Sequence, residues 1–253
     1  AIRSILEGIG RALSKKYDLC WFNLHFNRFV ETLEILVETV PNVSLVLDIG
    51  CSPGYMTVAI KRLGYEVLGI DPETRNLFPM SNEGIVVKKC DIQKEKLPFQ
   101  DEMFDCVMLT EVIEHLNYYF VGFALSEVKR VLKRNGCLIL STPNLAALEN
   151  RFFLLFGGSG HLGGGIINPV HNREYTLLEV LNFLREAGFR IESCKYSMAR
   201  DVITHTKDDF ITRDHVVRGF IKYIHWKNTG RVLAYPLKIL IPSFRSIIFV
   251  VSR

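Results

Sequence analysis

The pattern of apolar and polar positions between residues 45 and 71 predicts a strand, a tight turn, a helix and a second strand. Leu45–Ile49 is an almost continuous apolar run, Gly50–Gly54 contains the turn, and Glu66–Ile70 is a second strand followed by Asp71. Between the turn and the second strand, apolar residues recur at the spacing of a helix that packs one face on a sheet: Met56, Ala59, Ile60 and Leu63. This order places a ligand at the carboxyl end of the first strand.

The same kind of pattern predicts further elements on both sides of this unit. An apolar stripe from Ile2 to Leu13 and a second one from Phe22 to Val40, ended by Pro41, predict two helices. Downstream strands are expected at Ile85–Lys89, Phe104–Thr110, Cys137–Ser141, Phe189–Tyr196 and Ser246–Ser252. A helix is expected over Tyr118–Lys133, stopped by Gly136, and another after Thr176, where Glu179 completes a capping box and Gly188 ends the helix.

Two long segments interrupt this alternation. The glycine-rich stretch between Ala146 and Asn172 lacks the strand-then-helix context of a phosphate cradle, so we interpret it as a lid. Residues 199–245 are too long for a connection between two strands and predict a helical insertion that is well placed to select an acceptor. The first helix, residues 2–13, would suit an anionic membrane surface, but we favour packing on its own domain.

The residues of the turn exclude two common nucleotide sites. A dinucleotide fingerprint would need glycine where Ser52 and Tyr55 stand, and no Gly-Lys-Ser/Thr sequence of a phosphate loop enters the helix. An acid, Asp48, stands at the end of the first strand, and Asp71 ends the second. Because carboxylates repel phosphate and attract an ammonium or sulfonium group, the pocket favours a cationic nucleoside.

With these residues the chain resembles the class I S-adenosylmethionine (SAM) dependent methyltransferases. The resemblance extends from Val43 to Ser141 and is carried by LDIGCSPG, by Asp71, by CDIQ around Asp91 and by the run from Leu97 to Leu116. That run is similar to the small-molecule branch (types 11 and 23), which includes the ubiquinone-pathway O-methyltransferases. The resemblance implies an α/β fold: a Rossmann-like, mostly parallel sheet in the order 3-2-1-4-5-7-6, with strand 7 antiparallel and helices on both faces.

The resemblance also implies the residues that hold SAM, with S-adenosylhomocysteine as the product. In relatives the acid at the place of Asp91 bonds the adenine amino group, and Asp71 is suited to the ribose hydroxyls. The expected cofactor-binding residues are Asp48, Gly50, Cys51, Ser52, Gly54, Asp71, Pro72, Asp91, Ile92, Thr110, Glu111 and Val112.

The acceptor side is expected beyond the fourth strand. Three interpretations of Glu111, Glu114 and His115 stay open: cofactor contact with His115 as a base, a divalent-metal site, or local hydrogen bonding only. The catalytic residues that we expect are His115, His171 and Tyr175, without a metal. Asn144 and Arg173 would add polar groups, under a roof made of residues 157–175 and 199–245.

The charge and the cysteine content bear on the binding partners and on the cellular compartment. A formal charge of +4 over 253 residues is far from the basic surface of a nucleic-acid binder. The six dispersed cysteines favour reduced thiols without zinc or a disulfide, and with no signal-peptide pattern they indicate a cytoplasmic protein. We expect one methyltransferase domain over residues 1–253, with a helical cap at 1–41, acting on an oxygen of a metabolite, lipid precursor or sugar. The alternatives are a SAM-binding regulatory or assembly protein without turnover, and an RNA methyltransferase.

Overall fold

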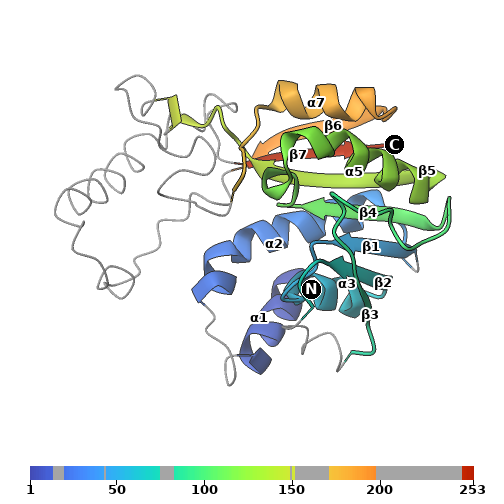
Figure 1. The fold of residues 1–253 in the computed structure, drawn as a ribbon. Coiled ribbons are helices and arrows are strands. Elements are labelled where there is room, and N and C mark those ends of the chain that lie inside the picture. The colour runs from blue at the N-terminus through green and yellow to red at the C-terminus, as the bar shows by residue number, and fades with distance from the viewer. Residues whose placement is uncertain (14–19, 43, 75–82, 149, 152–170, 198–246) are drawn as a thin grey trace.

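A computed structural model describes residues 1–13, 20–42, 44–74, 83–148, 150–151, 171–197 and 247–253. These residues form a sheet with helices on both of its faces (Figure 1). The expected insertion at 199–245 and most of the expected glycine-rich lid lie outside the described residues. Within the described parts, no helix combines the length and the apolarity needed to cross a bilayer.

The elements alternate along the chain much as the sequence pattern predicts. The helices are α1 (Ile2–Leu13), α2 (Cys20–Thr39), α3 (Tyr55–Arg62), the 3-10 helix η1 (Ile113–His115), α5 (Tyr118–Val131) and α7 (Leu177–Glu186). The strands are β1 (Leu45–Ile49), β2 (Glu66–Asp71), β3 (Val86–Lys89), β4 (Phe104–Thr110), β5 (Leu132–Pro143), β6 (Ile191–Ser197) and β7 (Ile247–Ser252). The Thr176 capping box at the start of α7 is present as predicted.

The strands lie in the order β3-β2-β1-β4-β5-β7-β6, which confirms the predicted topology. Strands β1 to β5 pair in parallel, whereas β7 runs antiparallel to both of its neighbours, β5 and β6. Because β1, β2 and β4 are parallel, their carboxyl ends lie at the same edge of the sheet, as in other doubly wound folds.

Two apolar cores cover the two faces of the sheet. Helices α1, α2 and α3 pack on one face, and α5 and α7 pack on the other (Figure 1). Leu6 and Ile9 of α1 are buried within the first core, which confirms that the N-terminal stripe packs on its own domain.

The boundary between α5 and β5 differs from the prediction. The helix ends at Val131 and the strand begins at Leu132, so Gly136 lies inside the strand and does not stop the helix. Leu132 is the parallel partner of Phe104, and strand pairing overrides the helical pattern at this point. A Cβ atom at Gly136 would lie 3.0 Å from the carbonyl oxygen of Phe104, so this glycine serves a close backbone approach.

Candidate functional site

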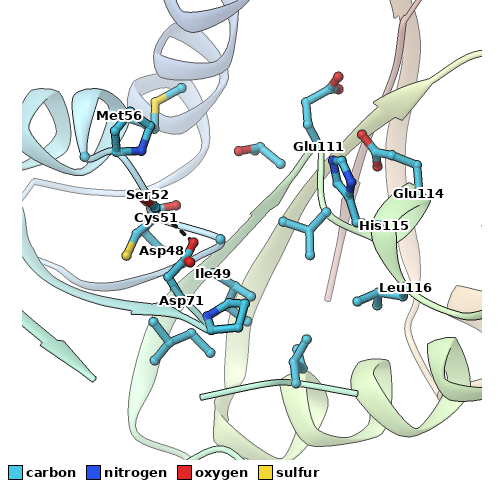
Figure 2. A pocket seen from close by; sticks show the side chains of 18 of the residues that line it. Asp48, Ile49, Cys51, Ser52, Met56, Asp71, Glu111, Glu114, His115 and Leu116 are labelled. Atoms are coloured by element: carbon cyan, nitrogen blue, oxygen red, sulfur yellow. Dashed lines mark hydrogen bonds between the residues drawn. The ribbon is translucent and has the colours of Figure 1, made fainter. Parts of the chain in front are cut away.

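A cavity of about 590 Å³ opens at the carboxyl ends of β1, β2 and β4, within the size range of small-molecule sites. All of the expected cofactor-binding residues line it, together with His115 and His171. In Figure 2 the glycine turn, Asp48 and Asp71 lie on one side of the cavity, and Glu111, Glu114 and His115 lie on the other. The cavity therefore joins the two groups of residues that the sequence singled out.

The turn after β1 requires glycine at its first position. Gly50 has a φ of +77°, and a Cβ atom there would lie 2.6 Å from Cγ2 of Val112. The amides of Gly50 and Cys51 both donate to the carbonyl oxygen of Ile70, which ties the turn to β2. Gly54, at φ +103°, is the N-cap residue that precedes α3 and makes no side-chain capping hydrogen bond. The turn is thus narrow and leaves its backbone open to a ligand.

Asp71 presents an oriented carboxylate at the end of β2. The amide of Ser52 donates to Oδ2 at 3.1 Å (Figure 2). The amide of Glu73 donates to Oδ1 at 2.8 Å. Burial raises the pKa of Asp71, and these two hydrogen bonds partly offset the increase. Since each oxygen has a further lone pair, the carboxylate can still accept hydrogen bonds from a diol.

Asp48 lies deeper, beneath the turn. Its side chain is 2% exposed, and the Thr57 hydroxyl of α3 donates to its Oδ2 atom at 2.6 Å. Burial raises the pKa of Asp48 to about 7, although the bond from Thr57 lowers it and the charge of Asp71 adds to the increase. A cationic ligand nearby would favour the ionised form of this acid.

Helix α2 contributes residues to the cavity that the sequence analysis missed. His25, Arg28, Phe29 and Thr32 line it, and the guanidinium of Arg28 donates to Oε2 of Glu111 at 2.8 Å. The polar residues His25, Arg28 and Thr32 recur at helical spacing beside the apolar stripe of α2, and this was the signal in the sequence. All three side chains are buried although they are polar, which fits a face of α2 that borders the cavity.

Glu111 is held in a conformation that non-glycine residues rarely adopt, with φ at +56°. Its Oε1 atom accepts a hydrogen bond from the hydroxyl of Ser141 on β5 at 3.1 Å. The backbone amide of Glu111 donates to the carbonyl oxygen of Ser141 at 2.8 Å. The ion pair to Arg28 completes this fixation. The surroundings therefore hold a strained backbone at the rim of the cavity, as is common at functional sites.

On the far side, Glu114, His115 and His171 converge. Each offers one ligand atom, and the three atoms lie within 4.8 Å of one another, so the cluster has donors suited to a metal ion. The rings of His115 and His171 meet edge to face with centroids 4.9 Å apart. Glu114 accepts a hydrogen bond from Thr142 of β5 at 3.0 Å, and its carbonyl oxygen binds the amides of Asn172 and Arg173.

His171 also contacts a carboxylate that the sequence analysis did not single out. Its Nδ1 atom lies 3.4 Å from Oε1 of Glu174, and both side chains are almost fully buried. A carboxylate on one ring nitrogen orients the imidazole and fixes which nitrogen carries the proton. The other nitrogen, Nε2, then becomes the acceptor in the neutral ring.

Three expected acceptor-side residues do not line the cavity. Tyr175 is fully buried, packs edge to face on Phe183 of α7, and forms a backbone bridge with Asn144. Burial, the largest effect, raises the pKa of Tyr175 to about 12, which disfavours its use as a base. Arg173 pairs with Glu179 and stacks over the Tyr118 ring. Of residues 171–175 only His171 lines the cavity, because Arg173 pairs with Glu179 and Tyr175 packs into the core.

Parts of the sequence match known proteins. Residues 47–140 match the family described as "Methyltransferase domain". A curated relative, the mitochondrial ubiquinone biosynthesis O-methyltransferase of Rattus norvegicus, is 30% identical over 138 residues, which are 51% of this chain and 39% of that protein. The ubiquinone biosynthesis O-methyltransferase of Bradyrhizobium diazoefficiens is 36% identical over 104 residues, 39% of this chain and 40% of that protein. The chain thus covers less than half of either relative.

Solved structures share the fold at lower identity. The 1,6-didemethyltoxoflavin-N1-methyltransferase of Burkholderia thailandensis, solved with 1,6-didemethyltoxoflavin and S-adenosylhomocysteine bound, has a TM-score of 0.58 at 14% identity. That comparison covers 98% of this chain and 86% of the other. The similarity concerns the arrangement of the sheet and its helices.

Proposed function

We propose that this chain is a class I SAM-dependent methyltransferase and that it transfers the methyl group of SAM to an oxygen of a small-molecule acceptor. The observation that carries the choice of oxygen is the pair His171–Glu174, at the far side of the cavity from the cofactor residues. An oxygen acceptor must lose a proton during transfer, and a carboxylate-oriented histidine is suited to take it. The relatives named as ubiquinone O-methyltransferases support this choice by analogy.

The residues around the glycine turn fit SAM. The close approach at Gly50 leaves the backbone accessible, and Asp71 has lone pairs for the two ribose hydroxyls. Asp91 and Ile92 follow β3 and line the same cavity, where we assign them to the adenine. SAM supplies an activated methyl group on a sulfonium, whose charge suits the buried carboxylate of Asp48.

We assign Arg28 to the carboxylate of the methionine part. It is the only lysine or arginine among the described residues that line the cavity. Its guanidinium already pairs with Glu111, and a guanidinium has enough donors to serve both carboxylates. Residues 1–41 would then form a cap that completes the cofactor site, in one domain with the sheet.

In the acceptor half, His171 acts as the base and Glu174 positions it. The acceptor hydroxyl would donate a hydrogen bond to Nε2 of His171 while its oxygen faces the methyl group. Displacement at the methyl carbon needs alignment and exclusion of water more than covalent help from the protein. His115, whose ring packs against that of His171, would limit the positions open to the acceptor.

Variants of the pair test this assignment. His171→Gln should lower the single-turnover rate of methyl transfer to catechol or phenol probes by about 10²-fold or more, as for loss of a general base. Glu174→Gln should lower it less and change its pH profile, because Glu174 acts through His171. SAM affinity, measured by calorimetry, should stay within about twofold in both variants.

Glu186→Gln, at an exposed position of α7, is the matched control and should retain both activity and affinity. If the two variants lost SAM affinity in proportion to activity, the proposed division between cofactor and acceptor halves would be wrong. An unchanged rate in His171→Gln would remove the histidine from the reaction.

A further inference from the structure

Two cysteines that lie far apart in the sequence are neighbours in the sheet. Cys106 of β4 and Cys137 of β5 are directly paired in the parallel register. Adjacent strands lie about 4.8 Å apart, within the range of about 4.4–6.8 Å between the Cα atoms of disulfide-linked residues. Both side chains belong to the core on the α1–α3 face. Little movement would be needed to bridge them.

A second cavity gives access to one member of this pair. It has a volume of about 610 Å³ and lies near the amino ends of β1 and β4, at the edge of the sheet away from the cofactor residues. Cys137 lines it, whereas the fully buried Cys106 does not. Lys133, Arg134 and Arg253 also line this cavity, together with Asp105 and Glu102, whose carboxylates pair with Lys133 and Arg134. Cys137 is 3% exposed, so a small reagent in this cavity would lie beside Cys137 and would not contact Cys106.

The surroundings give the two thiols different roles. The neighbouring thiol of Cys106 is the main cause that lowers the pKa of Cys137, and the charge of Arg253 lowers it further, against the effect of burial. Burial raises the pKa of Cys106 well above its ordinary value. A thiolate is the nucleophile in thiol chemistry, so Cys137 would react first and Cys106 second.

We propose that Cys137 is a modification site for small hydroperoxides and that Cys106 resolves the oxidised residue into a reversible disulfide. The thiolate of Cys137 attacks one peroxide oxygen, the O–O bond breaks, and the departing oxygen takes up a proton. The sulfur of Cys106 then attacks the sulfenic sulfur of Cys137, its proton leaves with the hydroxyl as water, and the S–S bond forms. Two thiols are oxidised by two electrons in total, and the hydroperoxide is reduced to its alcohol and one water, or to two waters in the case of hydrogen peroxide.

The remaining described cysteines lack this combination. Burial raises the pKa values of Cys51 and Cys90, the latter to about 11, which suppresses their thiolates. Cys194 on β6 is exposed but has no cysteine as a register partner. Cys194 therefore provides a matched control for simple accessibility.

The test exposes the full, folded chain to hydrogen peroxide, blocks remaining thiols with N-ethylmaleimide, and maps peptides by mass spectrometry. The wild type should lose two thiols, yield a linked pair of peptides carrying Cys106 and Cys137, and recover both thiols with a phosphine reductant. Cys106→Ser should stop at a sulfenic acid on Cys137 that dimedone traps. Cys137→Ser should leave Cys106 reduced, and Cys194→Ser should behave as the wild type.

Mapping of the wild type needs no variant, so a failure of a serine variant to fold does not affect that result. Circular dichroism before and after treatment shows whether the chain stays folded. Absence of the linked pair in folded protein, or its formation only in urea, would overturn the proposal. So would oxidation confined to Cys194.

Discussion

The guanidinium of Arg28 on α2 donates a hydrogen bond of 2.8 Å to the carboxylate of Glu111, which lies 83 residues further along the chain at the end of β4. Both side chains are largely buried, with exposed fractions of 7% and 12%. This ion pair therefore connects helix α2 to Glu111, whose backbone is strained, at the rim of the cavity. It also places one positive charge among several carboxylates.

Removing one partner should leave a buried charge unpaired. Arg28→Ala is expected to lower the free energy of unfolding by about 3 kcal/mol, as measured by urea denaturation. The double variant Arg28→Ala with Glu111→Gln should recover part of that loss, because no unpaired charge remains. Lys61→Ala, which breaks the exposed pair Lys61–Glu66, is the control and should change stability by less than about 1 kcal/mol. Equal losses in the two single variants would contradict this role.

Asp71 should contribute directly to SAM affinity. Asp71→Ala removes an oriented acceptor for the ribose hydroxyls and is expected to weaken binding by about 1–3 kcal/mol in titration calorimetry. Asp101→Ala, at an exposed position outside the cavity, serves as the comparison and should leave the affinity unchanged. Unchanged affinity in Asp71→Ala would remove this residue from the cofactor site.

Asp48 should make stability depend on pH in a definite direction. Its pKa is about 7 in the folded chain, against an ordinary value of 3.8, so the folded state holds a proton that the unfolded state has lost between these values. Asp48 therefore stabilises the folded state most at pH values below 3.8. This contribution to the free energy of unfolding decreases as the pH rises from 3.8 to 7. Between pH 5 and pH 8 the wild type should lose about 2 kcal/mol relative to Asp48→Asn. Asp101→Asn is the control, and parallel pH profiles for wild type and Asp48→Asn would contradict the raised pKa.

The sequence predicts most of the sheet because each strand carries its own signal. The run Phe104–Thr110 forms β4 with the predicted bounds, and Leu45–Ile49 forms β1. The end of α5 was misplaced because Leu132 continues the helical pattern but pairs with Phe104 in the sheet. Such a boundary depends on a contact between distant residues, which periodicity does not report.

The residues that line the cavity at the carboxyl edge of the sheet were predictable for the same reason. Asp48, Gly50 and Asp71 lie at or directly after the ends of strands, so the topology alone brings them to one edge. Arg28 and Glu174 were missed because they reach the site through tertiary packing, from a cap helix and from an irregular segment. Similarly, dispersed cysteines gave no sign that the register would pair Cys106 with Cys137.

Transfer of a deuterium-labelled methyl group from SAM to an acceptor hydroxyl tests the proposed activity most directly. The purified chain would be incubated with labelled SAM and a panel of catechols, phenols and aliphatic alcohols, and the products analysed by mass spectrometry. We expect a labelled methyl ether in at least one case, formed by the wild type and strongly reduced in His171→Gln. Binding of SAM without any labelled ether, or a label found only on nitrogen or on added RNA, would contradict the assignment.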